Sequence, residues 1–115
     1  MPPEVMSLAH DIHGAAAKIL RFTAGKTLDD YENDELLQSA VERQFEIVGE
    51  AMNLLRKQDA KLVEGITEWR SIISFRNLLI HGYALIAHKK VWLTIQTKLP
   101  ILHKEIEAII QSEPS

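Results

Sequence analysis

The feature that most constrains this fold is a stretch of helical periodicity from Asn33 to about Lys57. Apolar residues recur there every three or four positions and form two adjacent ridges, Leu37, Val41, Val48, Met52 and Leu55 beside Leu36, Ala40, Ile47, Ala51 and Leu54. Asn33 gives a start signal, and the acidic residues after it suit the positive end of a helix dipole. The stripe is wide enough to face a bundle core and a second subunit. We therefore predict one long helix here.

Similar patterns predict helices along most of the remaining chain. In chain order we expect a helix over Glu4–Phe22, a capping-box turn at Thr27–Asp30, a connection over Gln58–Thr67, and helices over Trp69–Ile80 and His88–Thr97. Pro100 either starts a fifth helix or kinks the fourth. The economical architecture is an all-α, antiparallel bundle of four to five helices, with residues 1–115 as a single domain.

Composition excludes several classes of protein. The formal net charge is −3, so any contact with RNA or DNA has to be local rather than driven by a polycationic surface. The chain has no cysteine, which excludes disulfides and thiolate chemistry. It has neither the N-terminal pattern of a secretory signal nor an apolar stretch of about 18 residues. We expect a cytoplasmic protein without a membrane span or a cofactor.

The most informative segment is Arg76-Asn77-Leu78-Leu79-Ile80-His81-Gly82-Tyr83. On a helical wheel, Arg76 lies in the middle of an apolar stripe. A guanidinium is always charged, so a position on such a stripe requires either a carboxylate partner or a function. Periodicity alone favours an ion pair with Glu46 or Glu50 of the long helix. Gly49, inside that helix, predicts close helix packing.

His81 is roughly 140° from Arg76 on an ideal helix, so the two would not share a face. Gly82 changes this expectation, because glycine allows the helix to end and His81 to bend back toward Arg76. The alternative is an ordinary histidine at a helix C-terminus, which interacts favourably with the dipole.

Together these residues suit a phosphodiester site. Histidine exchanges protons near neutral pH, and arginine binds a phosphate and stabilises charge on it. Asn77 adds a neutral donor and acceptor, and Tyr83 adds a hydroxyl. Attack of an RNA 2′-OH on its own phosphate needs only these roles and no metal. One Arg and one His form a small active site, so two copies meeting across a dimer would be more effective.

The order of several motifs resembles that of the HepT-like toxins of the HEPN superfamily, which are paired with minimal nucleotidyltransferase antitoxins in two-gene modules. The resemblance runs from Leu8 to about Ile109, through the sequence landmarks ELLQSAVERQ at 35–44, GEA at 49–51, Trp69, FRN at 75–77, His81-x-Tyr83, Val91-Trp92 and Leu99-Pro100. It implies a homodimeric, HEPN-like bundle with two Arg-x4-His motifs facing a shared cleft. It also implies a metal-independent endoribonuclease.

Carried over by the motif, Arg76 and His81 would be catalytic, with Asn77 as the polar residue after the arginine. Tyr83 would be the tyrosine that the antitoxin modifies with AMP, which silences the toxin by adding negative charge. Glu50 and Gly82 would support the site. Gly82 stands where many relatives have an aspartate.

Two other interpretations stay open. The chain could be a non-catalytic helical module whose Tyr83 is the substrate of a partner nucleotidyltransferase, or a structural helical dimer with a degenerate site. A metal site is not expected: His10 and His13 are three residues apart, but no third ligand is identifiable from the sequence.

Overall fold

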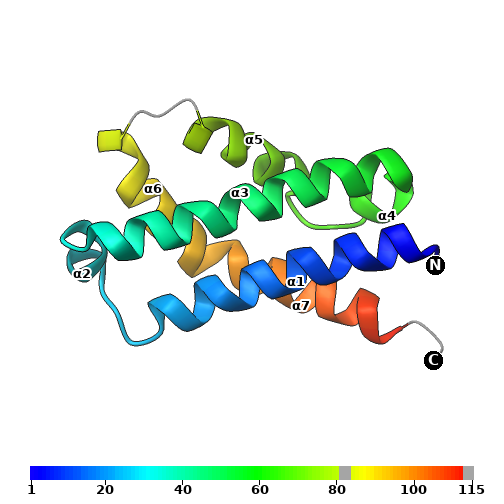
Figure 1. The fold of residues 1–115 in the computed structure, drawn as a ribbon, viewed down its shortest axis with the longest axis horizontal. Helices are drawn as coiled ribbons and strands as arrows, with labels where there is room; N and C mark the ends of the chain where they lie inside the picture. The colour runs from blue at the N-terminus through cyan, green and yellow to red at the C-terminus, as the bar shows by residue number, and fades with distance from the viewer. Residues whose placement is uncertain (81–83, 113–115) are drawn as a thin grey trace.

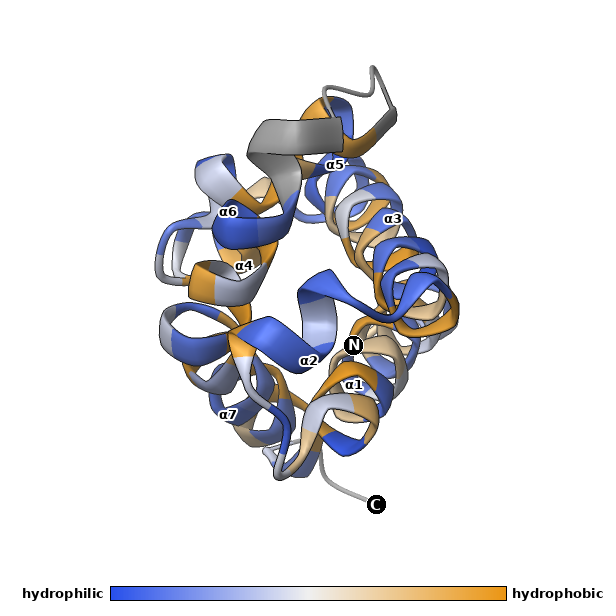
Figure 2. Ribbon diagram, turned by 90° about the vertical axis from the view of Figure 1, so that its left-hand side faces the viewer, coloured by the Kyte–Doolittle hydropathy of each residue, from blue (hydrophilic) through white to orange (hydrophobic). Residues whose placement is uncertain are grey.

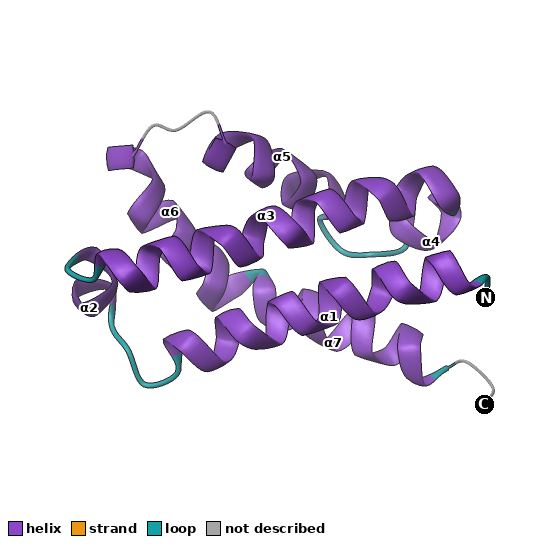
Figure 3. Cartoon of the chain, viewed as in Figure 1, coloured by secondary structure: helices purple, strands orange, loops and turns teal. Residues whose placement is uncertain are grey.

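The computed structural model describes residues 1–80 and 84–112, with the backbone alone for Ile80 and residues 84–87. Every regular element within these ranges is a helix (Figure 3). The helices are α1 (Pro3–Thr23), α2 (Leu28–Glu32), α3 (Glu35–Gln58), α4 (Ala60–Glu64), α5 (Trp69–Ile80), α6 (Ala84–Thr97) and α7 (Leu99–Gln111). The predicted all-α bundle is confirmed. Its long members are α1, α3, α5, α6 and α7, while α2 and α4 are single turns.

Helices α1 and α3 lie side by side along the longest dimension of the molecule (Figure 1). Helix α5 packs on α3, and α7 packs on α1. Seen from the end, α5, α3, α1, α7 and α6 follow one another around the bundle (Figure 2). No helix in the described ranges is long and apolar enough to cross a membrane.

The core lies between α1, α3 and α7. Its fully buried members include Ile12, Ile19, Val41, Met52, Leu55, Leu102 and Ile106. Each such side chain contributes about 1.5–3 kcal/mol relative to an exposed one. The first predicted ridge of α3 is buried throughout, whereas the second is only partly covered: Leu36 is 81% exposed and Leu54 is 43% exposed.

The start of α3 differs from the prediction by one residue. Asp34, not Asn33, caps the helix, because its carboxylate accepts the Leu37 N–H at 3.0 Å. Asn33 instead ends α2. The capping box of α2 is confirmed: the Asp30 N–H donates to Thr27 Oγ1 at 3.1 Å, and the Thr27 N–H donates to Asp30 Oδ2 at 2.9 Å. That hydrogen bond from the Thr27 backbone lowers the pKa of the Asp30 carboxyl.

Three boundaries elsewhere refine the predicted pattern. The connection after α3 contains α4, whose start is capped by the Asp59 side chain through the Leu62 N–H at 3.1 Å. Helix α6 starts at Ala84 rather than His88. Pro100 lies in the first turn of α7, so it starts a helix rather than kinking one.

Candidate functional site

Helix α5 approaches α3 closely at Gly49, which is buried. A Cβ added there would overlap the Arg76 Cβ and would lie 3.1 and 3.2 Å from its Cγ and Cδ. The aliphatic stem of Arg76 therefore occupies the space that the missing side chain leaves. The predicted close packing at Gly49 is confirmed, and the residue it accommodates is the arginine of the motif.

The charged end of Arg76 is not satisfied in the way that periodicity favours. Glu50 is exposed, and no ion pair joins Arg76 to Glu46 or Glu50, both of which the structure describes. Glu46 instead lies 3.7 Å from Arg43 on its own helix. The predicted ion pair is therefore wrong, because both carboxylates are directed elsewhere.

The Nε atom of Arg76 is buried and has no hydrogen-bond partner among the described residues. Burying a polar group of this kind without a partner costs free energy. The adjacent Asn77 is exposed on α5. Helix α5 thus presents the cationic side chain of Arg76, which is half-buried, and the neutral amide of Asn77, which is exposed.

The other predicted site residues, His81, Gly82 and Tyr83, lie outside the described residues. Whether His81 turns toward Arg76 stays a prediction. Arg76 and Asn77 occupy the second half of α5, and Gly82 is not needed to account for where Arg76 lies.

The first turn of α5 carries further positive charge. The guanidinium of Arg56, from α3, lies 4.7 Å from the centre of the Trp69 ring, and that of Arg70 lies 5.0 Å from it. Both distances are within the range of cation–π attraction. The apolar residues of α5 are mostly half-buried, and Phe75 is its most deeply buried one, at 7% exposed. The apolar face of this helix is therefore only partly covered.

A second group of polar residues, not predicted from the sequence, lies between α2, α3 and α6. The Tyr31 ring is fully buried, and its centre lies 5.8 Å from the centre of the His88 ring. Burial raises the pKa of the Tyr31 hydroxyl, and the nearby Glu42 carboxylate adds to the effect. Burial also raises the pKa of Glu42, which His88 opposes and Glu46 reinforces. The sequence gives no signal for this group, because it depends on how three helices pack.

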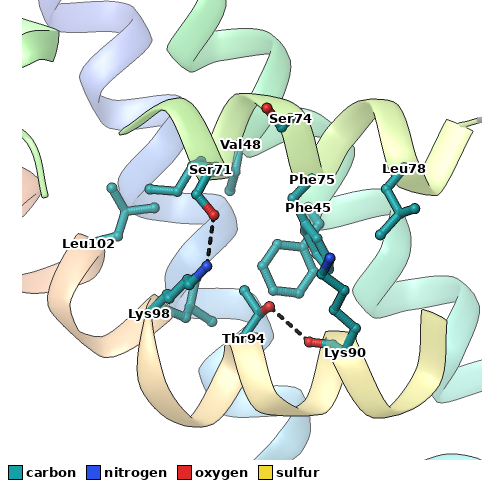
Figure 4. Close-up of a pocket in the computed structure, with 12 residues that line it drawn as sticks. Phe45, Val48, Ser71, Ser74, Phe75, Leu78, Lys90, Thr94, Lys98 and Leu102 are labelled. Carbon is teal, nitrogen blue, oxygen red and sulfur yellow. Dashed lines mark hydrogen bonds between the residues drawn. The ribbon is translucent and has the colours of Figure 1, made fainter. Parts of the chain in front are cut away.

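A cavity of about 290 Å³ borders α5 on the side of α6 and α7 (Figure 4). Its apolar lining includes Phe45, Val48, Phe75 and Leu102. At its edge the Lys98 ammonium donates to Ser71 Oγ at 2.7 Å and lies 3.8 Å from Glu68. The cavity leaves α3 as the principal support of α5.

Comparison with known proteins adds to this geometry. The family model described as Ribonuclease HepT-like matches residues 12–109. A candidate RNase of Methanocaldococcus jannaschii is 26% identical over 106 residues, which are 92% of this chain and 96% of that protein.

Two further relatives are more similar in sequence. A candidate RNase of Caldanaerobacter subterraneus subsp. tengcongensis is 33% identical over 89 residues, 77% of this chain and 79% of its own. A candidate ribonuclease HepT of Thermococcus cleftensis is 31% identical over 99 residues, 86% of this chain and 89% of its own. No solved structure is a significant match to the chain.

Proposed function

Because the chain belongs to the Ribonuclease HepT-like family, we propose that it is a metal-independent endoribonuclease and the toxin of a two-gene toxin–antitoxin module. The observation that carries the proposal is the position of Arg76. Its stem is packed against Gly49, and its buried Nε has no partner among the described residues. An arginine that is held in place but not neutralised by a neighbouring carboxylate is suited to bind a phosphate.

The proposed reaction is a transesterification within RNA. The 2′-oxygen forms a bond to the adjacent phosphorus while the bond from phosphorus to the 5′-oxygen breaks. His81 accepts the proton of the 2′-OH or donates one to the leaving 5′-oxygen. Arg76 stabilises the negative charge on the non-bridging oxygens, and Asn77 offers a further hydrogen bond. The products are a 2′,3′-cyclic phosphate and a 5′-OH, and no metal is required.

A homodimer would bring two such motifs into one cleft and supply two histidines. The half-buried apolar face of α5 supports this arrangement, because a second copy would cover it. We place the dimer contact on this side of the molecule, next to Arg76.

The test is cleavage of a single-stranded RNA in the presence of EDTA, with the products analysed for cyclic phosphate ends. Arg76→Ala and His81→Ala should each slow cleavage by at least about 100-fold. Arg21→Ala and His10→Ala, two exposed residues of the same types on α1, serve as matched controls and should cleave like the parent protein. Full activity of both motif variants, or cleavage that stops in EDTA, would overturn the proposal.

One observation favours a regulatory role for Tyr83. The chain has two tyrosines, and Tyr31 is fully buried. A partner nucleotidyltransferase that transfers AMP from ATP to a tyrosine hydroxyl, with release of pyrophosphate, could therefore not reach Tyr31, which leaves Tyr83 as the candidate acceptor. We propose Tyr83 as the acceptor. Such a modification adds negative charge near Arg76 and His81 in sequence and would compete with substrate phosphate.

This second proposal is tested with labelled ATP and the minimal nucleotidyltransferase that the proposed two-gene module requires. The parent chain and Tyr31→Phe should take up label, and Tyr83→Phe should not. Label that persists in Tyr83→Phe would exclude Tyr83 as the acceptor. A modified chain that never cleaves RNA would favour the interpretation as a non-catalytic substrate.

A further inference from the structure

A cluster of possible metal ligands lies between α1 and α7, away from the α5 arginine. It contains His13 from α1, and His103 and Glu107 from α7. One ligand atom from each of the three lies within 4.8 Å of those from the other two, and all three side chains are partly buried. The cluster lies where α7 packs on α1, whereas Arg76 is on α5 and packs against α3 (Figure 1). The cluster is therefore separate from the proposed ribonuclease site.

The two ligands on α7 are four residues apart, which places both side chains on one face of the helix. Such a spacing is common in metal sites that use one helix for two ligands. His13 approaches from α1, with its Nε2 3.5 Å from Glu107 Oε1. Tetrahedral ligands of zinc, at bond lengths of about 2.0–2.2 Å, are roughly 3.3 Å apart. The His13–Glu107 distance is close to this value, and no separation within the cluster exceeds 4.8 Å.

One polar atom of the cluster lacks a hydrogen bond. His13 Nε2 is buried and has no hydrogen-bond partner among the described residues, although it lies 3.5 Å from Glu107 Oε1. The rings of His13 and His103 are stacked, with centres 4.6 Å apart and planes at 25°.

Neighbouring groups support this assignment by having other partners. Glu105, two residues before Glu107, accepts hydrogen bonds from the Thr67 N–H at 3.0 Å and the Thr67 hydroxyl at 2.8 Å. His10 is exposed one turn before His13 and is not part of the cluster. Two of the three ligands thus come from α7, about 90 residues further along the chain, and only His13 comes from α1.

We infer that His13, His103 and Glu107 bind one Zn²⁺, which joins α1 to α7 and keeps a fourth position for water. Two imidazoles and one carboxylate suit zinc better than magnesium, which prefers oxygen ligands. The ion would stabilise the folded chain, because the ligands come together only when α1 and α7 are packed.

The test uses the full chain without an affinity tag, titrated with ZnCl₂ by calorimetry and followed by thermal unfolding. The expected result is one Zn²⁺ per chain. Tm should rise by about 5–10 °C when free Zn²⁺ is about 100 times its dissociation constant, and should fall back on addition of EDTA. MgCl₂ should have no comparable effect. Binding is measured without RNA, so the outcome does not depend on whether the chain is a ribonuclease.

The variants His103→Gln and Glu107→Gln should each weaken Zn²⁺ binding at least 10-fold, and His10→Gln is the matched control that should bind like the parent. Far-UV circular dichroism establishes that each variant is folded. Absence of binding to the parent would overturn the inference. Equal binding by His103→Gln and Glu107→Gln would also overturn it, as would loss of binding in His10→Gln, which would place the ion on α1 alone.

Discussion

The α1–α7 interface and the α3–α5 interface bury polar groups in opposite ways. At the first, His13, His103 and Glu107 come from two helices and lie within reach of one another. At the second, Arg76 is packed against the backbone of Gly49, and its Nε has no partner in the described part of the chain. The first interface belongs to the buried core, while the second has a half-covered apolar face. The α1–α7 side of the bundle therefore contributes mainly to stability. The α5 side instead presents a charge that is available for binding.

The largest expected effect contrasts the packing of the two interfaces. Ile12→Ala removes a fully buried α1 side chain and should lower the free energy of unfolding by about 2–5 kcal/mol. Ile73→Ala, on the half-buried face of α5, should cost less than about 1.5 kcal/mol. Urea unfolding of both variants measures the difference. Equal costs would mean that α5 is as fully packed as the core.

The same pair of variants sharpens the case for a dimer. If a second copy covers α5, the cost of Ile73→Ala should grow with protein concentration, because association stabilises the folded state by mass action. The cost of Ile12→Ala should not depend on concentration. If the cost of Ile73→Ala does not depend on protein concentration, the dimer contact lies elsewhere.

The next effect separates stability from activity at Arg76. Arg76→Met keeps an unbranched stem against Gly49 but removes the charge. We expect cleavage to fall at least about 100-fold, while the free energy of unfolding stays the same or rises by up to about 1 kcal/mol, since no buried ion pair is broken. RNA cleavage and urea unfolding are the measurements. A loss of stability above about 2 kcal/mol would reveal a partner that Arg76 depends on.

A third prediction contrasts two glycines within helices. Gly49→Ala should lower the free energy of unfolding by about 1–2 kcal/mol, because overpacking against Arg76 outweighs the helix propensity that alanine adds. Gly14→Ala on α1 has open space at the same position and should raise it by about 0.5–1 kcal/mol. Changes of the same sign in thermal unfolding of the two variants would contradict the close approach at Gly49.

The smallest effect concerns Glu42, whose pKa is raised chiefly by burial. A carboxyl with a raised pKa binds more protons when folded, so its penalty is largest above the folded pKa and disappears as the pH falls to its ordinary value. Glu42→Gln should therefore stabilise the protein near pH 7, by less than about 1 kcal/mol because solvent screens the group, and not near pH 4. Urea unfolding at both pH values checks this. An equal gain in the free energy of unfolding at pH 7 and at pH 4 would contradict this prediction.

Much of the fold could be predicted because the long helices have clear apolar periodicity and recognisable ends. The prediction for α5 matches its bounds, and those for α1 and α3 are within two residues. The one-turn helix α4 was missed, since five residues are too few to show a period. The start of α6 before His88 was missed because the sequence has no Ser, Thr, Asp or Asn just before Ala84 to signal it.

Less of the candidate site could be predicted from the sequence. Periodicity placed Arg76 on an apolar stripe but favoured a carboxylate partner, because it cannot show that Glu50 is directed outward. The contact with Gly49 explains how Arg76 fits on the apolar stripe, because its aliphatic stem packs where a side chain is missing. The ligands His103 and Glu107 were missed because their closeness to His13 depends on the packing of the first helix against the last. His81 and Tyr83 stay predictions from the motif.

The contact between Gly49 and Arg76 has a consequence for the conditions under which the arginine keeps its place. An arginine oriented by an ion pair would loosen at high salt or when its carboxylate is protonated. Arg76 is located instead by van der Waals contact with a helix backbone, which neither salt nor acid weakens directly. Ionic strength should therefore change how strongly the protein attracts RNA, but not where this guanidinium lies when the RNA arrives.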